Sequence, residues 1–123
     1  MQQSILQSVK AQIPISPDQG DVFDTQIIIY INSTFANLHQ LGLGPKNGFR
    51  INDEHSTWEE FIGSDDPRFN DVITYVGLKV KLLFDPPANA TLLGAIKDAI
   101  KEAEWRLNIS AESYEPLPEE DLF

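Results

Sequence analysis

The sequence contains no cysteine, and this absence removes several classes of function at once. A chain without cysteine has no disulfide framework, no thiolate metal site and no cysteine nucleophile. No apolar run approaches the length of a membrane-spanning helix, and the polar start MQQSILQSVK does not resemble a signal peptide. We therefore expect a protein that is made and used without secretion or membrane insertion.

Basic residues are scarce: 9 Lys and Arg stand against 19 Asp and Glu, which gives a formal net charge of −10. A surface of this kind repels phosphate, so general binding to nucleic acid is disfavoured. No basic residue follows Arg106. Five acidic residues follow it: Glu112, Glu115, Glu119, Glu120 and Asp121. The chain is therefore predicted to end in an acidic segment.

The sequence also lacks the recurring motifs of catalysis. There is no phosphate-binding loop, no HExxH and no GxSxG. The two histidines are His39, which is predicted at a helix end, and His55, which closes the triplet DEH. That triplet offers metal ligands, but adjacent residues rarely converge on one ion and no second cluster supports it. We therefore predict no enzyme, no catalytic residue, no cofactor and no metal site.

Helical spacing of apolar residues predicts an all-α protein, a compact bundle of about four to five helices. The chain is long enough for one domain, which we place at residues 1–110. The expected helices cover residues 3–13, 25–42, 56–63, 67–85 and 88–110. A glycine-rich structured loop precedes the third helix, and a short β segment at Gly48–Ile51 is compatible with its pattern. Residues 111–123 are expected to form an extended acidic tail.

The stretch VGLKVKLL alternates between apolar and polar residues as a strand does, but the longer run around it favours a helix. Apolar residues from Phe69 to Phe84 recur at helical spacing and form one continuous face. A single strand from Phe69 to Asp85 would span roughly 50 Å, far more than ordinary strands do. A second apolar stripe consists of Tyr75, Leu78 and Leu82. Either neighbouring helices of the same chain or another subunit must cover it.

The last expected helix has a core stripe that runs from Leu92 to Leu107. Trp105 lies about half a turn around from Ile96, among charged residues. A large aromatic side chain on a charged face is typical of a contact with a partner, although a Trp packed under a loop or tail of its own chain gives the same pattern. The candidate residues for a subunit interface are Tyr75, Leu78, Leu82, Trp105 and Ile109.

The acidic tail contains spaced apolar residues: Tyr114, Leu117, Leu122 and Phe123. A free tail is the usual outcome for such a composition. The apolar residues instead suggest a strap that becomes ordered against a neighbouring protein. Both interpretations stay open at the level of the sequence.

Four stretches, in this order, resemble the small helical head–tail connector (adaptor) proteins of long-tailed bacteriophages: INSTFANLHQLGLGPKNGFRI, TWEEFIG, YVGLKVKLLFDPP and EAEWRLN. The resemblance covers roughly Ile31 to Asn108. The most specific part is LKVKLLFDPP followed by EWRL at this spacing.

The resemblance implies a structural virion protein at the head–tail interface, assembled in the cytoplasm of the bacterial host. Proteins of this kind form a homo-oligomeric ring, usually of dodecameric symmetry, under the portal. The ring joins the DNA-filled head to the stopper or tail-completion protein, and it leaves a channel through which DNA passes without specific binding. No membrane partner is implied. The alternatives are a monomeric acidic helical binding module that mimics DNA, or another neck protein such as a stopper or tail-completion protein.

Overall fold

The computed structural model describes residues 3–15 and 17–113. This part of the chain forms α1 (Ile5–Lys10), the 3-10 turn η1 (Pro17–Gln19), α2 (Asp24–Gln40), α3 (Trp58–Phe61), α4 (Phe69–Phe84) and α5 (Ala90–Ser113). The all-α prediction is confirmed, and residues 67–85 contain a helix rather than a strand.

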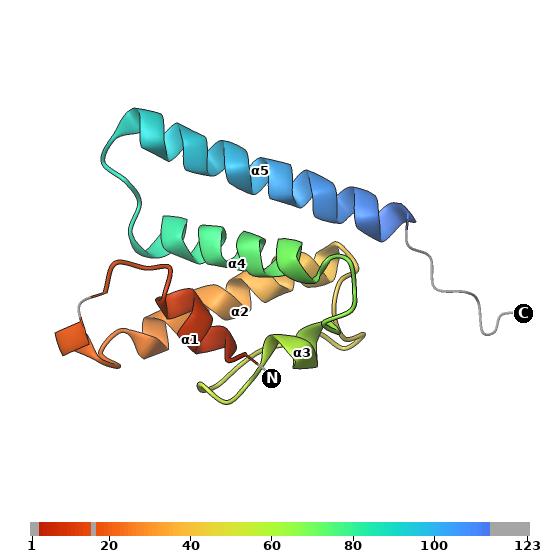
Figure 1. Cartoon of the computed structure of the whole chain (residues 1–123), viewed down its shortest axis with the longest axis horizontal. Helices are drawn as coiled ribbons and strands as arrows, with labels where there is room; N and C mark the ends of the chain where they lie inside the picture. Colours follow the sequence, from red (N-terminus) through yellow and green to blue (C-terminus); the bar gives the residue numbers. More distant parts are fainter. Residues whose placement is uncertain (1–2, 16, 114–123) are drawn as a thin grey trace, which may run out of the picture.

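Helix α4 lies in the middle of the molecule. Helix α5 packs along one side of it, while α2 and α1 lie on the other side (Figure 1). Helix α4 stops shortly before Pro86 and Pro87, because proline lacks the N–H that a helix needs. The side chain of Asn89 then accepts a hydrogen bond from the N–H of Leu92 at 3.0 Å and caps the start of α5. The two apolar faces of α4 are thus mostly covered by helices of its own chain.

The hydrophobic core follows this layering. Buried residues of α4 contribute to both sides of the helix: Val72, Tyr75, Val76 and Val80. Helix α2 contributes the buried side chains of Ile27, Ile31, Phe35 and Leu38. Among residues 90–109 of α5, the buried apolar side chains are Ile100, Ala103 and Leu107. A helix of this length that buries so few side chains has a large outer face that the described residues leave uncovered.

The N-terminal segment fixes the position of α3. The N–H of Ile5 donates to the carbonyl of Ser56 at 3.0 Å, and the N–H of Trp58 donates to the carbonyl of Gln3 at 3.1 Å. The indole N–H of Trp58 also donates to the hydroxyl of Ser8 at 2.7 Å. Because the Trp58 side chain is fully buried, these contacts join α1 and α3 into one part of the core.

The expectation of a β segment at Gly48–Ile51 is wrong, since no strand forms within the described residues. The side chain of Asn32 on α2 takes the place of a partner strand. Its amide donates to the carbonyl of Ile51 at 3.0 Å, and its oxygen accepts from the N–H of Ile51 at 2.7 Å. The backbone is therefore satisfied without a second strand.

The end of α5 also differs from the expectation. The helix continues to Ser113, three residues into the segment predicted as tail. Tyr114, Leu117, Leu122 and Phe123 lie outside the described residues. Leu92, which was expected in the core, is 53% exposed. Helix α5 packs mainly on α4, so its first turn is only partly covered.

Asn32→Ala tests the contact that holds the loop. Loss of the amide leaves the N–H and carbonyl of a nearly fully buried residue, Ile51, without these partners. The free energy of unfolding, measured by urea titration, will fall by roughly 1–3 kcal/mol. The matched control is Asn47→Ala on the exposed part of the same loop, which will change it by no more than about 0.5 kcal/mol. Equal effects of the two substitutions would contradict this role of Asn32.

Candidate functional site

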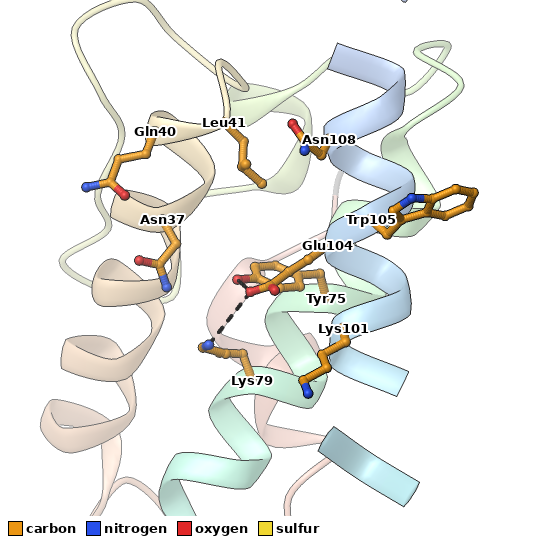
Figure 2. Close-up of a pocket in the computed structure, with 9 residues that line it drawn as sticks. All are labelled: Asn37, Gln40, Leu41, Tyr75, Lys79, Lys101, Glu104, Trp105 and Asn108. Atoms are coloured by element: carbon orange, nitrogen blue, oxygen red, sulfur yellow. Dashed lines mark hydrogen bonds and ion pairs between the residues drawn. The ribbon is translucent and has the colours of Figure 1, made fainter. Parts of the chain in front are cut away.

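An open groove lies between α2 and α5, with α4 as its floor (Figure 2). Its volume is about 570 Å³. Helix α2 contributes Asn37 and Gln40, Leu41 follows directly after it, and α4 contributes Tyr75 and Lys79. Helix α5 contributes Lys101, Glu104, Trp105 and Asn108. The walls are therefore rich in amide side chains, which both donate and accept hydrogen bonds.

Tyr75 and Glu104 form the polar contact at the floor of the groove. The Tyr75 hydroxyl donates to Oε2 of Glu104 at 2.9 Å, and Nζ of Lys79 lies 3.9 Å from the same oxygen (Figure 2). Burial of the phenol, together with the nearby carboxylate, raises the pKa of Tyr75 well above its ordinary value. The phenol therefore stays protonated and acts as a hydrogen-bond donor.

Tyr75 was predicted as a subunit contact, but it belongs to the core of a single chain. Its side chain is 0% exposed. The phenol ring lies under α5, where its hydroxyl donates a hydrogen bond to Glu104. Leu78 and Leu82, its partners in the predicted stripe, are half-buried and pack against the same core. This stripe is thus mostly used inside the subunit.

Trp105 stands at the edge of the groove, and Ile109 follows it by four residues on α5. Trp105 is 63% exposed and Ile109 is 42% exposed. The indole of Trp105 projects away from the groove rather than into it (Figure 2). Residues four apart share one face of a helix, so these two side chains form an apolar patch. We call it the Trp105–Ile109 patch. No described residue of the chain buries it.

A second exposed apolar surface was not predicted from the sequence. Val22 and Leu83 are strongly exposed. Their neighbours in sequence, Phe23 and Phe84, pack ring against ring at 5.2 Å, so Val22 and Leu83 lie at the same end of the molecule. We call this pair the Val22–Leu83 surface. Helical spacing assigned Leu83 to the core face of α4, and Val22 stood between two expected helices, so no sequence signal marked either as exposed.

The two surfaces lie toward opposite ends of the helix pair. Helix α5 runs antiparallel to α4, so the end of α4 that carries Leu83 is near the start of α5 (Figure 1). Trp105 comes 15 residues after Ala90, the first residue of α5, which is about 22 Å along a helix. The subunit thus presents two different apolar surfaces that are well separated.

The acidic triplet around His55 serves the local structure. The N–H of His55 donates to Oδ1 of Asp53 at 2.9 Å, which closes a turn. Within residues 3–15 and 17–113, no group of three or more His, Asp or Glu side chains is placed to hold a metal ion. Among the helices of the same residues, none combines the length and the apolar character that crossing a membrane requires.

Comparison with known proteins gives a family match. A family model described as phage connector protein matches residues 5–114, which is most of the chain. No curated protein and no solved structure matches the chain significantly.

Tyr75→Phe tests the contact at the floor of the groove. The variant loses the hydrogen bond to Glu104 with little change in packing, so the free energy of unfolding near neutral pH will fall by about 0.5–1.5 kcal/mol. The raised pKa of Tyr75 stabilises the wild-type fold fully below the pKa of the unfolded chain. This contribution is lost as the pH rises above the ordinary value of 10.0.

The advantage of the wild type over Tyr75→Phe, measured by urea unfolding at several pH values, will therefore shrink above that pH. A difference that stays constant through the same range would show that Tyr75 ionises equally in the folded and unfolded chains.

Proposed function

The chain belongs to the phage connector protein family, and we propose that it is the subunit of a homo-oligomeric ring under the portal. Membership of this family gives the protein a structural role in the neck of a bacteriophage and a place in the virion. In the proposed assembly, the ring joins the DNA-filled head to the stopper or tail-completion protein. Its symmetry follows the dodecameric portal, and it assembles in the cytoplasm of the bacterial host.

The outer face of α5 is the observation that carries the ring proposal. A ring requires a heterologous contact, in which one surface of a subunit meets a different surface of the next and closes by rotation. The Trp105–Ile109 patch and the Val22–Leu83 surface are two such surfaces, toward opposite ends of the helix pair. A well-exposed Trp is also the residue type that most often dominates the energy of a protein contact. Leu78 and Leu82 are half-buried and contribute at most an edge of this contact.

The net charge of the chain supports a channel for DNA. With a formal net charge of −10, the subunit as a whole repels phosphate. A ring of such subunits lets DNA pass without retaining it, because few cations are present to neutralise phosphates. The structural family also favours a role other than catalysis.

In the proposed assembly, the acidic tail attaches the subunit to the portal. Its four apolar residues, Tyr114, Leu117, Leu122 and Phe123, are spaced as in a strap that docks onto a neighbouring protein. The support for this contact is composition alone, since these residues lie outside the described part of the chain.

Trp105→Glu tests the ring contact. The substitution places a charge in the proposed contact, while the fold is preserved because the side chain is mostly exposed. The variant will be added at increasing concentration to DNA-filled heads that lack the protein, and attachment will be measured by co-sedimentation. Half-maximal attachment will require roughly tenfold more protein or worse than for the wild type.

Lys97→Glu is the matched control, because it places the same side chain at an exposed position of α5 outside the patch. It will attach as the wild type does. Equal attachment of Trp105→Glu and the wild type would remove the Trp105–Ile109 patch from the ring contact.

Replacement of the four apolar tail residues by alanine tests the portal contact separately. We expect weaker attachment to heads by roughly tenfold, because the strap loses the side chains that would fill pockets on the portal. Urea unfolding will show that the variant remains folded, since none of these residues belongs to the described core. Undiminished attachment in the co-sedimentation assay would show that the tail does not hold the portal.

A further inference from the structure

We propose that the acidic C-terminal segment, residues 115–123, lies in the groove between α2 and α5 of its own subunit when the protein is free. The occupant is thus a part of the same chain, and the site is the amide-lined groove of Figure 2. The inference concerns the free subunit and does not depend on the formation of a ring.

The groove has the chemistry of a site for an extended acidic peptide. Asn37 and Gln40 on one wall and Asn108 on the other offer amide groups that can both donate to and accept from a peptide backbone. The apolar side chain of Leu41 stands beside them. Extended peptides are commonly held in this way, by polar contacts to the main chain and a few contacts to side chains.

The charges of the groove favour carboxylates. Lys79 and Lys101 line it, against the single carboxylate of Glu104. Glu104 already accepts the hydroxyl of Tyr75 and lies near Lys79. Among residues 3–15 and 17–113, Lys101 has no ion-pair partner. In a chain with a net charge of −10, a groove in which cations outnumber carboxylates attracts the most acidic segment.

The segment has the reach that this position requires. Helix α5 ends at Ser113, which is about 18 Å along the helix from Lys101. The ten residues that follow Ser113 extend to roughly 33 Å, so they can turn back and follow the groove. Asn108 is only about 8 Å from the helix end, so the segment leaves α5 near one end of the groove.

The sequence of the segment suits a groove of this kind. Pro116 and Pro118 restrict the backbone to extended conformations, which lowers the entropy lost on docking. Glu119, Glu120 and Asp121 follow them and supply carboxylates for the two lysines. Since the segment is tethered to its own groove, its effective concentration there far exceeds that of a segment from another subunit.

This docking gives the proposed connector a regulated tail. If the segment also attaches to the portal, as proposed above, the groove and the portal compete for it. The segment is then held in the free subunit and released on assembly. This consequence rests on the proposed function, whereas the docking itself is tested on the free protein.

The absence of cysteine allows a direct test in the full chain, because Asp121→Cys creates a single site for a nitroxide spin label. Amide signals will be recorded by NMR with the label paramagnetic and then reduced. Amides around Asn37, Gln40, Lys101 and Asn108 will lose most of their intensity in the paramagnetic state. Amides at the Val22–Leu83 surface will keep theirs. Unselective loss, or none at the groove, would overturn the proposal.

Further samples test whether the docked segment comes from the same chain and whether the groove lysines hold it. Isotope-labelled protein without the spin label, mixed with spin-labelled protein of natural isotope content, will show no loss at the groove. A loss there would show that the segment comes from another copy and would contradict docking within one chain. The charge reversals Lys79→Glu and Lys101→Glu, made together, will abolish the loss within one chain. Lys81→Glu with Lys97→Glu, the same change of charge outside the groove, will leave it intact.

If the amides at the groove still lose intensity in the variant with Lys79→Glu and Lys101→Glu, the two lysines do not hold the segment. Urea unfolding of both pairs establishes that each remains folded. None of these samples contains a portal, so their outcome is independent of whether the ring forms.

Discussion

The burial of α4 on both sides is the constraint on which the rest of the structure depends. Its apolar residues continue around the helix, so one neighbour cannot cover them. Helix α2, with α1, covers one side and α5 covers the other. Because α5 packs mainly on α4, no other described helix covers its outer face, and Trp105 and Ile109 stand there exposed. The groove has the same origin, since α2 and α5 both rest on α4 and leave a space between them.

The helices were predictable because their apolar residues recur at helical spacing. The length of the run around VGLKVKLL decided between helix and strand, and α4 lies where this argument placed it. The spacing could not tell what covers each face. Tyr75 was assigned to a subunit contact on the same grounds that place Leu78 beside it, yet α5 and the carboxylate of Glu104 bury it within the chain. Such a partner is distant in sequence and leaves no periodic signal.

The details that escaped prediction share this cause. The side chain of Asn32 bonds the backbone of Ile51 as a neighbouring strand would. No local sequence pattern predicts that an amide side chain makes these two hydrogen bonds. Leu83 and Leu92 have the spacing of core residues, but they stand near helix ends where cover is incomplete. The charged residues around Trp105 placed it on the outer face of α5, and there its side chain is 63% exposed; the sequence left open whether a partner or a part of the same chain covers it. Its role in a contact between subunits stays a prediction.

The central claim is that this chain forms a ring between the portal and the tail. The most direct measurement is electron microscopy of the portal vertex after the purified protein is mixed with DNA-filled heads that lack it. The account predicts a continuous ring of density directly under the portal, with the outer face of α5 from each subunit against the next. Vertices that stay bare while the protein remains monomeric would contradict it.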